Sequence, residues 1–367
     1  MILHLANDEK VINRAIELFE KSFPQNNLFV IFGKKPFHMV KSGKNIISYK
    51  EYDERKYSHL ISSVIIHYLT DKKVRFMKRH IDRTIPAYWI MWGSDLYHRM
   101  LESKGFEIRY KKGNYDKRIC KYVLTPFNKI NDAIRTEKRV AFVNKHIKYL
   151  VTSTIEDDYE IALKYFPGLK EKEHKEFSYY PIDSIINKES PKKFSGNGIQ
   201  LGHSASLTDN HEYVFNILSQ FDTSGRKIIT PLSYSGNKRY RKYVINKGKE
   251  LFGEDFDPVL KFLPLEKYNK LMASASVAIY GNWRQEAVGN ILISLYLGEK
   301  IFFSKRNPIL KWAERHGFKV FELENMTQEE LDAPLDEQAA INNRKILLEH
   351  FNSTELYGSI KKEFLEI

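Results

Sequence analysis

Arg284 is the residue whose position most clearly indicates chemistry. It stands between an apolar run, 277–280, with the length and β-branched content of a buried strand, and a segment, 285–297, that suits a buried helix because it is apolar on nearly every side. The first amides of a helix attract anions, and a guanidinium beside them adds a positive charge. This junction predicts a phosphate-binding site; the alternative is an ordinary strand–helix unit with an incidental arginine.

Polar stretches also follow other predicted strands, and they cover residues 92–97, 202–206 and 232–236. Parallel α/β sheets bind ligands beyond the carboxyl ends of their strands, which is where these stretches would lie. They are therefore candidate binding loops.

Several common ligand motifs are missing from the sequence. There is no Gly-x-Gly-x-x-Gly after a predicted strand and no Gly-x4-Gly-Lys-Ser/Thr, which argues against nicotinamide dehydrogenases and P-loop enzymes. Asp255-Phe256-Asp257 has the letters of a metal–diphosphate site but precedes a predicted strand, so we interpret it as loop acids. The single Cys120 excludes a cysteine cluster for zinc. We therefore predict no metal, and expect cations and helix N-termini to stabilise a leaving diphosphate.

The elements that must position these residues alternate between strands and helices. A chain of 367 residues is too long for one ordinary core, and a polar linker with many turn-forming residues spans 187–198. The alternation predicts two doubly wound, Rossmann-like α/β domains facing each other across a cleft. We place the first domain at 1–190, the second at 198–326, and helices that pack across the domains at 327–367.

Composition limits the protein class and its location. Hydrophobic content of 42% and charged content of 29% are those of a soluble globular protein. No signal peptide or spanning segment is evident, and a single cysteine fits a reducing compartment, so we expect a cytoplasmic protein. Residues 104–148 carry thirteen Lys or Arg against four acids, mixed with aromatics. That segment suits a nucleic-acid surface, an anionic membrane face or a plain solvated face.

Four ordered stretches resemble a known family. Trp92-Gly-Ser-Asp-Leu-Tyr97 resembles the Trp-Gly-x-Asp-Leu-Tyr signature of the TDP-N-acetylfucosamine:lipid II N-acetylfucosaminyltransferases, glycosyltransferase family 56. The other similar stretches are 201–211 (Gly-His-Ser-Ala-Ser-Leu-Thr-Asp-Asn-His after Leu201), 229–235 (Ile-Thr-Pro-Leu-Ser-Tyr-Ser), and 284–289 (Arg-Gln-Glu-Ala-Val-Gly) together with Arg306-Asn-Pro308. The sequence departs from the family pattern at His203, Ala205 and Glu286, which flank the implied donor pocket.

The resemblance implies a GT-B fold and a glycosyl transfer. The second domain would bind a nucleotide-sugar, a dTDP-linked deoxy-acetamido sugar of the 4-acetamido-4,6-dideoxy-galactose type. The first would hold a polyprenyl-diphosphate-linked saccharide acceptor. Two alternatives stay open: a GT-B transferase with another sugar and a soluble acceptor, or a basic nucleic-acid-binding protein without catalysis. We predict no nucleic-acid partner, because no recognisable nucleic-acid motif is present.

The resemblance and the strand ends together define the candidate site residues. The catalytic candidates are Arg284, which would offset the charge of the leaving diphosphate, and Asp95, which would act as a base on the acceptor hydroxyl or instead hold its loop backbone. The donor-binding candidates are His203, Ser204, Asn210, His211, Tyr234, Asn282, Arg284, Gln285, Glu286, Gly289, Asn290 and Lys305. The acceptor-binding candidates are His4, Asn7, Trp92, Ser94, Asp95 and Tyr97.

A lipid-linked acceptor also gives the basic segment 104–148 a purpose. The lipid tail of such an acceptor would stay in the bilayer, so the enzyme would dock as a peripheral protein on the inner face of the cell membrane. Each Lys or Arg near anionic headgroups contributes about 1 kcal/mol to such binding.

Overall fold

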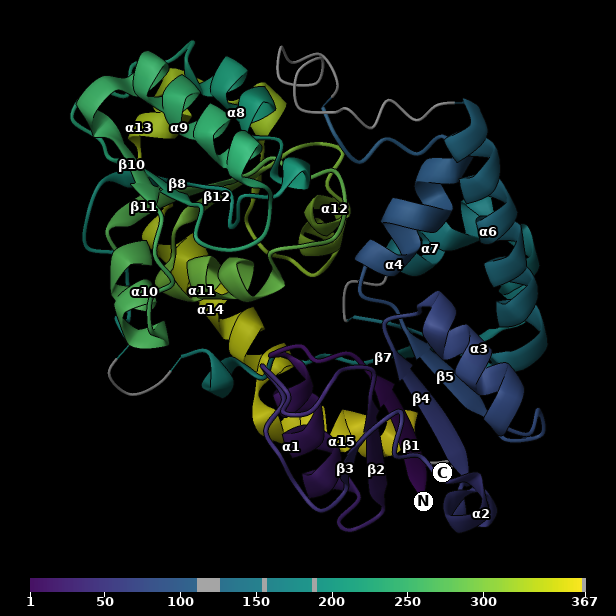
Figure 1. Ribbon diagram of the computed structural model, residues 1–367. Helices are drawn as coiled ribbons and strands as arrows, with labels where there is room; N and C mark the ends of the chain where they lie inside the picture. The colour runs from purple at the N-terminus through teal and green to yellow at the C-terminus, as the bar shows by residue number, and fades with distance from the viewer. Residues whose placement is uncertain (111–125, 154–156, 187–189, 365–367) are drawn as a thin grey trace. The chain divides into compact units, whose positions relative to one another are not determined.

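The computed structural model describes residues 1–110, 126–153, 157–186 and 190–364. Two parallel sheets, each covered by helices on both faces, form two compact units (Figure 1). The first unit consists of Met1–Phe106, Pro126–Pro181 and Ser353–Ile367, and the second contains 107–110 and Ile182–Asn352. The predicted α/β architecture of two doubly wound sheets with C-terminal helices is confirmed.

The first unit is built on a seven-stranded sheet with the order β3-β2-β1-β4-β5-β6-β7. All its pairings are parallel, and Leu3 of β1 lies opposite both Leu28 of β2 and Val64 of β4. The strands are β1 (Ile2–Ala6), β2 (Asn27–Ile31), β3 (Ile46–Ser48), β4 (Ser63–His67), β5 (Ala87–Ile90), β6 (Tyr149–Thr152) and β7 (Glu173–Glu176). The central strands are buried along their whole length, as expected for a parallel sheet covered on both faces.

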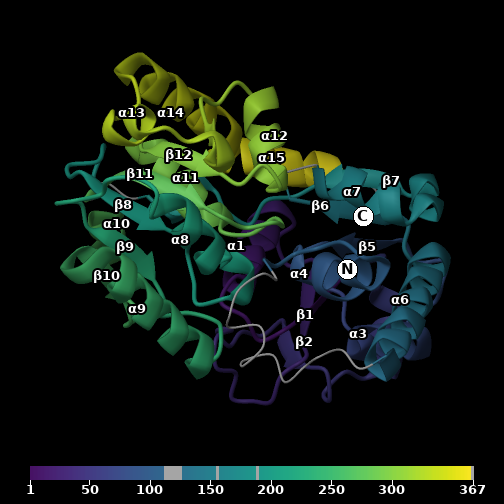
Figure 2. The ribbon, with the colours of Figure 1, turned by 90° about the horizontal axis from the view of Figure 1, so that it is seen from above.

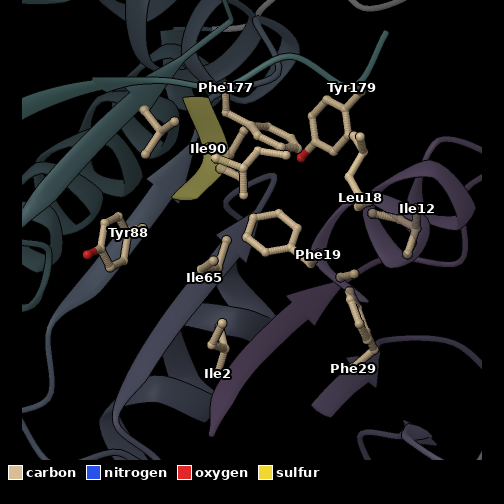
Figure 3. Packing of buried hydrophobic residues seen from close by; sticks show 14 of the residues in the cluster. Ile2, Ile12, Leu18, Phe19, Phe29, Ile65, Tyr88, Ile90, Phe177 and Tyr179 are labelled. Carbon is tan, nitrogen blue, oxygen red and sulfur yellow. The ribbon is translucent and has the colours of Figure 1, made fainter. Parts of the chain in front are cut away.

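Helices of the first unit lie on both faces of this sheet. The longer ones are α1 (Ile12–Ser22), α3 (Asp71–His80), α6 (Pro126–His146), α7 (Asp157–Tyr165) and α15 (Ser353–Glu363), and the short ones are α2 (Glu54–Tyr57) and α4 (Ser94–Leu96). Helices α1 and α15 contact each other, and α3 contacts α6. Phe19 projects from α1 onto the sheet near Ile65 (Figure 3), and its ring contacts those of Phe177 and Phe364.

The second unit is built on a six-stranded sheet with the order β10-β9-β8-β11-β12-β13, again parallel throughout. In Figure 2 the labelled strands follow one another in this order from β10 to β12. The strands are β8 (Gly198–Leu201), β9 (Ile228–Pro231), β10 (Phe256–Val259), β11 (Ala275–Tyr280), β12 (Lys300–Phe303) and β13 (Phe321–Glu322).

Two sets of helices cover this second sheet. Figure 1 shows α8 (His211–Leu218), α9 (Lys238–Phe252) and α13 (Gln328–Asp332) on one face, with α10 (Leu265–Met272), α11 (Val288–Leu297) and α14 (Glu337–Phe351) on the other. Helix α12 (Pro308–Arg315) begins with proline, and Asn307 caps it by accepting a hydrogen bond from the amide of Ile309. Helix α14 packs on α11, whereas α15 packs on α1 of the first unit.

Both sheets have a point where the strand order reverses. In the first sheet the chain leaves β1 in one direction and β4 in the other; in the second, β8 and β11 are the corresponding pair. Loops that diverge at such a point leave a crevice at the carboxyl ends of the strands, where open α/β sheets bind ligands. In the described part of the chain, no helix combines the length and the apolar composition needed to cross a membrane.

Candidate active site

Asp209 organises the reversal point of the second sheet. It lies in the 3-10 helix η6 (Leu207–Asp209) between β8 and α8, and its side chain is fully buried. Its carboxylate accepts hydrogen bonds from His203 Nδ1 (2.7 Å), from the Ser204 amide (2.9 Å) and hydroxyl (2.7 Å), and from Asn282 Nδ2 (2.9 Å). Because Asn282 follows β11, one carboxylate joins the loops after both central strands.

His203 and Asp209 form a buried ion pair. Burial opposes the charged imidazole of His203, but the Asp209 carboxylate outweighs burial and raises the pKa of His203. Burial would likewise raise the pKa of Asp209, but the His203 charge and the donated hydrogen bonds hold it well below its usual value. His203 Nε2 also lies 4.0 Å from Glu286 Oε2, so the imidazole is located between two carboxylates.

Arg284 lies in the loop that follows β11, and only 8% of it is exposed. Its Nη2 donates to Glu286 Oε2 (2.5 Å) and to the Thr208 hydroxyl (3.4 Å), and its Nη1 donates to the Gln285 carbonyl (3.1 Å). Glu286 in turn accepts from Asn282 Nδ2 (2.6 Å). The guanidinium is thus held in a buried network of alternating charges.

The helix after Arg284 begins later than predicted. The sequence predicted a helix over 285–297, but α11 begins at Val288, and Ala287 before it adopts a left-handed backbone with φ of 65°. Residues 281–287 remain a loop because Glu286 turns back toward Arg284 and Asn282. The predicted Gly289 and Asn290 therefore lie in the first turn of α11, where Asn290 donates to the Tyr268 hydroxyl (2.9 Å).

The structure brings together one group of the predicted donor residues: His203, Ser204, Asn282, Arg284, Gln285 and Glu286. Asn210 supports them, because its Nδ2 donates to the Gly281 carbonyl (2.9 Å). His211 lies on the buried side of α8 with Nδ1 paired to the Tyr240 hydroxyl (3.0 Å), and burial lowers its pKa to about 4.

Two further donor candidates lie near the same edge of the sheet. Tyr234 is 61% exposed, and its carbonyl accepts from the amide of Ala205 in the loop after β8 (2.8 Å). Lys305 follows β12, and its amide donates to Glu324 (2.8 Å) while its side chain is exposed. The donor roles of Tyr234 and Lys305 stay predictions.

Asp95 of the first unit lies in the interior. It is 1% exposed, and its carboxylate accepts from the Leu69 amide (2.7 Å), Trp89 Nε1 (2.8 Å) and the Trp92 amide (2.9 Å). Burial raises the pKa of Asp95, and these donors reduce that shift. Three donors, two of them loop amides and one a side chain of β5, favour the second role that the sequence left open, in which Asp95 holds loop backbone, over that of a base.

Two other acceptor candidates, His4 and Tyr97, are buried like Asp95. His4 is fully buried in β1 between His67 (3.0 Å) and Asn27 (3.1 Å), and burial lowers its pKa to about 3. Tyr97 is also fully buried, and its hydroxyl donates to Asp158 (2.6 Å). Both side chains lie in the core of the first unit, so in this structure neither has an exposed surface that an acceptor could contact.

Three acceptor candidates remain partly accessible: Asn7, Trp92 and Ser94. Trp92 Nε1 donates to the Tyr179 hydroxyl (2.8 Å), and Ser94 begins α4. Asn7 follows β1 and lines a cavity in the first unit. These three residues keep their predicted acceptor roles as hypotheses.

Sequence reasoning missed several residues of the second unit. Asp209 and Thr208 lie inside the stretch 201–211 but were not chosen, although a carboxylate just before a helix is a visible signal. Arg306 stacks over Trp283, with 3.7 Å between its guanidinium carbon and the ring centroid, and it pairs with Glu107 Oε2 (3.1 Å). That contact joins residues 199 positions apart, which no local pattern could reveal.

The basic segment 104–148 lies only partly within the described residues, because 111–125 fall outside them. On α6, Ile130 and Ile134 are exposed, as are Arg135 and Lys138. Among the described residues, no cluster of three or more His, Cys, Asp or Glu side chains has the arrangement of a metal site.

Solved structures with a similar fold include several glycosyltransferases. Anabaena Alr3699/HepE, crystallised with UDP and glucose, has a TM-score of 0.67 at 12% identity, with 100% of both chains covered. Sucrose-phosphate synthase from Thermosynechococcus elongatus has a TM-score of 0.66 at 11% identity, covering 100% of this chain and 98% of the other. WaaG, a glycosyltransferase of lipopolysaccharide biosynthesis, has a TM-score of 0.59 at 11% identity, covering 99% and 98%. The predicted GT-B fold is confirmed.

Sequence comparison identifies the family. A search of curated protein sequences finds no significant match to this chain. The family model for 4-alpha-L-fucosyltransferases, glycosyl transferase group 56, matches residues 75–357, which is well over half of the chain. The chain therefore belongs to the 4-alpha-L-fucosyltransferase family, glycosyl transferase group 56, and is a glycosyltransferase.

Proposed function

We propose that this glycosyltransferase moves a 4-acetamido-4,6-dideoxy-galactose unit from a dTDP-sugar to a polyprenyl-diphosphate-linked saccharide. The observation that carries the donor half is the buried Arg284 network at the strand reversal of the second sheet. The stretches 92–97, 201–211, 229–235 and 284–289, which resemble the family, support the choice of sugar and acceptor. HepE, with the same fold, was crystallised with UDP and glucose, which supports a nucleotide-sugar donor.

In this proposal the second unit binds the donor in the crevice between the loops after β8 and β11. Transfer breaks the bond between the anomeric carbon and the diphosphate oxygen, and negative charge grows on the leaving diphosphate. Arg284 offsets that charge, together with the first amides of α11 around Gly289. Glu286, which pairs with Arg284 here, would then turn to the sugar hydroxyls.

His203 and Ser204 have a supporting part in the same scheme. The Asp209 carboxylate fixes both side chains and favours the positively charged form of His203. A cationic imidazole at the edge of the crevice adds to the attraction for diphosphate. The acceptor would lie against the first unit near Asn7, Trp92 and Ser94.

A thermal-shift panel tests the donor half. We expect TDP to raise the melting temperature of the chain, and UDP, GDP and CMP to raise it less, because the proposed donor is a dTDP-sugar. A ligand that binds only the folded state stabilises a protein in proportion to ln(1 + [L]/Kd), so the tighter nucleotide gives the larger shift. At a concentration of about 100 Kd the gain is about 2.7 kcal/mol. Equal responses to all four nucleotides would contradict the thymidine preference, and no response to any would contradict nucleotide-sugar binding.

Membrane docking through α6 is a separate part of the proposal. Its exposed Ile130 and Ile134 lie one turn apart beside Arg135 and Lys138, which suits an apolar and cationic face on anionic headgroups. We expect salt-sensitive flotation with phosphatidylglycerol vesicles, and at least about a tenfold loss of binding in the Arg135→Glu, Lys138→Glu double variant, since each cation contributes about 1 kcal/mol.

A matched double reversal in the second unit controls for net charge. Lys311→Glu with Lys345→Glu changes the total charge equally at two exposed positions on α12 and α14. That variant should float like the parent protein. If both doubles lose binding alike, α6 is not the docking face; if the parent protein ignores anionic vesicles, a soluble acceptor becomes the better hypothesis.

A further inference from the structure

A polar cavity of about 430 Å³ lies at the strand reversal of the first sheet. It opens where the loops after β1, β2 and β4 diverge, and of the predicted site residues it includes Asn7. Its lining residues are Asn7, Phe32, Tyr68, Leu69, Thr70, Asp71, Lys72, Arg75 and Arg139. Cavities of roughly 300–1,000 Å³ at such positions hold small-molecule ligands.

The lining of this cavity carries a positive excess. Lys72, Arg75 and Arg139 contribute three cations, against the single carboxylate of Asp71. Arg139 already neutralises Asp71, with Nε at 2.9 Å and Nη2 at 2.7 Å from the same oxygen. Lys72 and Arg75 are exposed, and neither has an ion pair among those recorded for the described residues. The cavity therefore favours an anion.

The N-terminus of helix α3 lies at this cavity. Thr70 caps the helix by accepting from the Lys73 amide (3.3 Å), and Asp71 and Lys72 occupy the first turn. The positive end of a ten-residue helix adds to the attraction for negative charge.

Arg139 supplies an independent sign of a missing ligand. It reaches the cavity from α6, is only 5% exposed, and is held by Asp71 through Nε and Nη2. Its Nη1 is buried and has no hydrogen-bond partner among the described residues. A buried donor left unpaired destabilises the folded chain, so an anion that accepted from Nη1 would be stabilised at this place.

The wall of the cavity is fixed from behind. The buried Lys73 donates to the carbonyls of His67 and Tyr68, the latter at 2.8 Å, and Asp95 accepts from the Leu69 amide at 2.7 Å. Tyr68 is held in a left-handed conformation with φ of 66°. The role of Asp95 in the stretch 92–97 is thereby explained: it positions the loop that forms this wall.

We propose that this cavity binds the diphosphate of the acceptor, with Lys72, Arg75 and Arg139 as its cationic ligands. The proposal rests on the proposed function for one point, that the acceptor is linked through a diphosphate. Guanidinium groups suit this ligand because their fork of N–H donors matches the oxygens of a phosphate. The volume leaves room for the diphosphate and part of the attached group.

The test is equilibrium binding of inorganic pyrophosphate and of farnesyl diphosphate to the full chain, with TDP saturating the donor site. Lys72→Gln and Arg75→Gln should each weaken the binding of both probes about tenfold, the loss expected for one charge-assisted hydrogen bond. Arg79→Gln is the matched control, because it removes an exposed cation from the same helix outside the cavity. It should change binding less than twofold.

Each outcome of this experiment decides between stated alternatives. If both probes bind and only Lys72→Gln and Arg75→Gln weaken them, the site is confirmed; tighter binding of farnesyl diphosphate than of pyrophosphate identifies a lipid-linked source over a free anion. If the probes fail to bind, or if Arg79→Gln weakens them equally, the site is wrong even though TDP binds. Failure of TDP to bind would instead contradict the donor half of the proposed function.

Arg139→Gln provides a further readout. We expect it to abolish pyrophosphate binding, but it also removes the partner of Asp71, so its melting temperature must be measured first. The exposed positions Lys72 and Arg75 keep the test valid if this variant does not fold.

Discussion

Replacing Arg284 by alanine is expected to lower kcat by about 100- to 1,000-fold, the usual loss when one preorganised donor to a developing negative charge is removed. The side chain is 8% exposed and sits between Thr208 and Glu286 at the end of β11, so water cannot replace its charge without rearranging the loop. The donor KM should change less than kcat, because the diphosphate charge grows as the sugar leaves. Initial rates with varied donor measure both constants.

The control for this variant must separate chemistry from loop collapse. Arg284→Ala leaves the buried Glu286 without its cation, which by itself destabilises the loop. The double variant Arg284→Ala, Glu286→Gln removes both charges and should recover the melting temperature without recovering kcat. Lys311→Ala, at an exposed position of α12 in the same unit, should behave like the parent protein. Retention of more than a tenth of the activity in Arg284→Ala would contradict the assignment.

Replacing Asp209 by alanine is expected to destabilise the folded chain by about 3–5 kcal/mol, the usual cost of breaking a buried charge pair from one side. The change leaves the donors of His203 and Ser204 without this acceptor, and it removes the hydrogen bond to Asn282 that joins the loops after β8 and β11 through this carboxylate. Denaturant unfolding of the full chain measures the loss. A change below 1 kcal/mol would show that the loops hold together without this carboxylate.

Asp209→Asn is the matched variant, and it predicts a distinct pH dependence. The raised pKa of His203 contributes stability that is present below its ordinary value of 6.5 and is lost as pH rises through the raised value. The lowered pKa of Asp209 contributes stability that is present above its ordinary value of 3.8 and is lost as pH falls.

The advantage of the parent protein over Asp209→Asn should therefore be largest between about pH 3.8 and 6.5, and it should shrink as pH rises through the raised pKa of His203. Comparing the two proteins cancels buried groups that do not interact with Asp209, such as His4. His211 does interact with Asp209, but burial lowers its pKa to about 4, so it stays neutral over most of this range. Melting temperatures of both proteins across this range make the measurement. A constant difference would mean that His203 does not titrate against Asp209.

The two parallel sheets could be predicted from the sequence because strand signals are local. Buried strands such as β11 appear as short runs of apolar and β-branched residues, and polar turns after them mark the carboxyl ends. The position of Arg284 at such an end was predicted for the same reason. The start of α11 was misplaced because helix-forming composition does not reveal that Ala287 adopts a left-handed backbone.

Asp209 and Arg139 show what local patterns could not provide. Asp209 gains its importance from Asn282, 73 residues away, and Arg139 from Asp71, 68 residues away. Asp209 and Asn282 meet because they follow the adjacent parallel strands β8 and β11, and Arg139 meets Asp71 because α6 contacts α3. Residue type indicates what a side chain can do, but its partners decide which of its capacities is used.

His4 and Asp95 illustrate the same limit from the opposite direction. Both stand near the end of a predicted strand and carry groups capable of chemistry. In the structure, however, His4 is hydrogen-bonded to His67 and Asn27. The Asp95 carboxylate accepts hydrogen bonds from the amides of Leu69 and Trp92. By itself the sequence determined the α/β alternation, the family resemblance and the region of Arg284, because those depend on neighbouring residues. Only the tertiary structure decided which polar groups are satisfied in the interior and which remain to bind a ligand, because burial and hydrogen bonding depend on the whole fold.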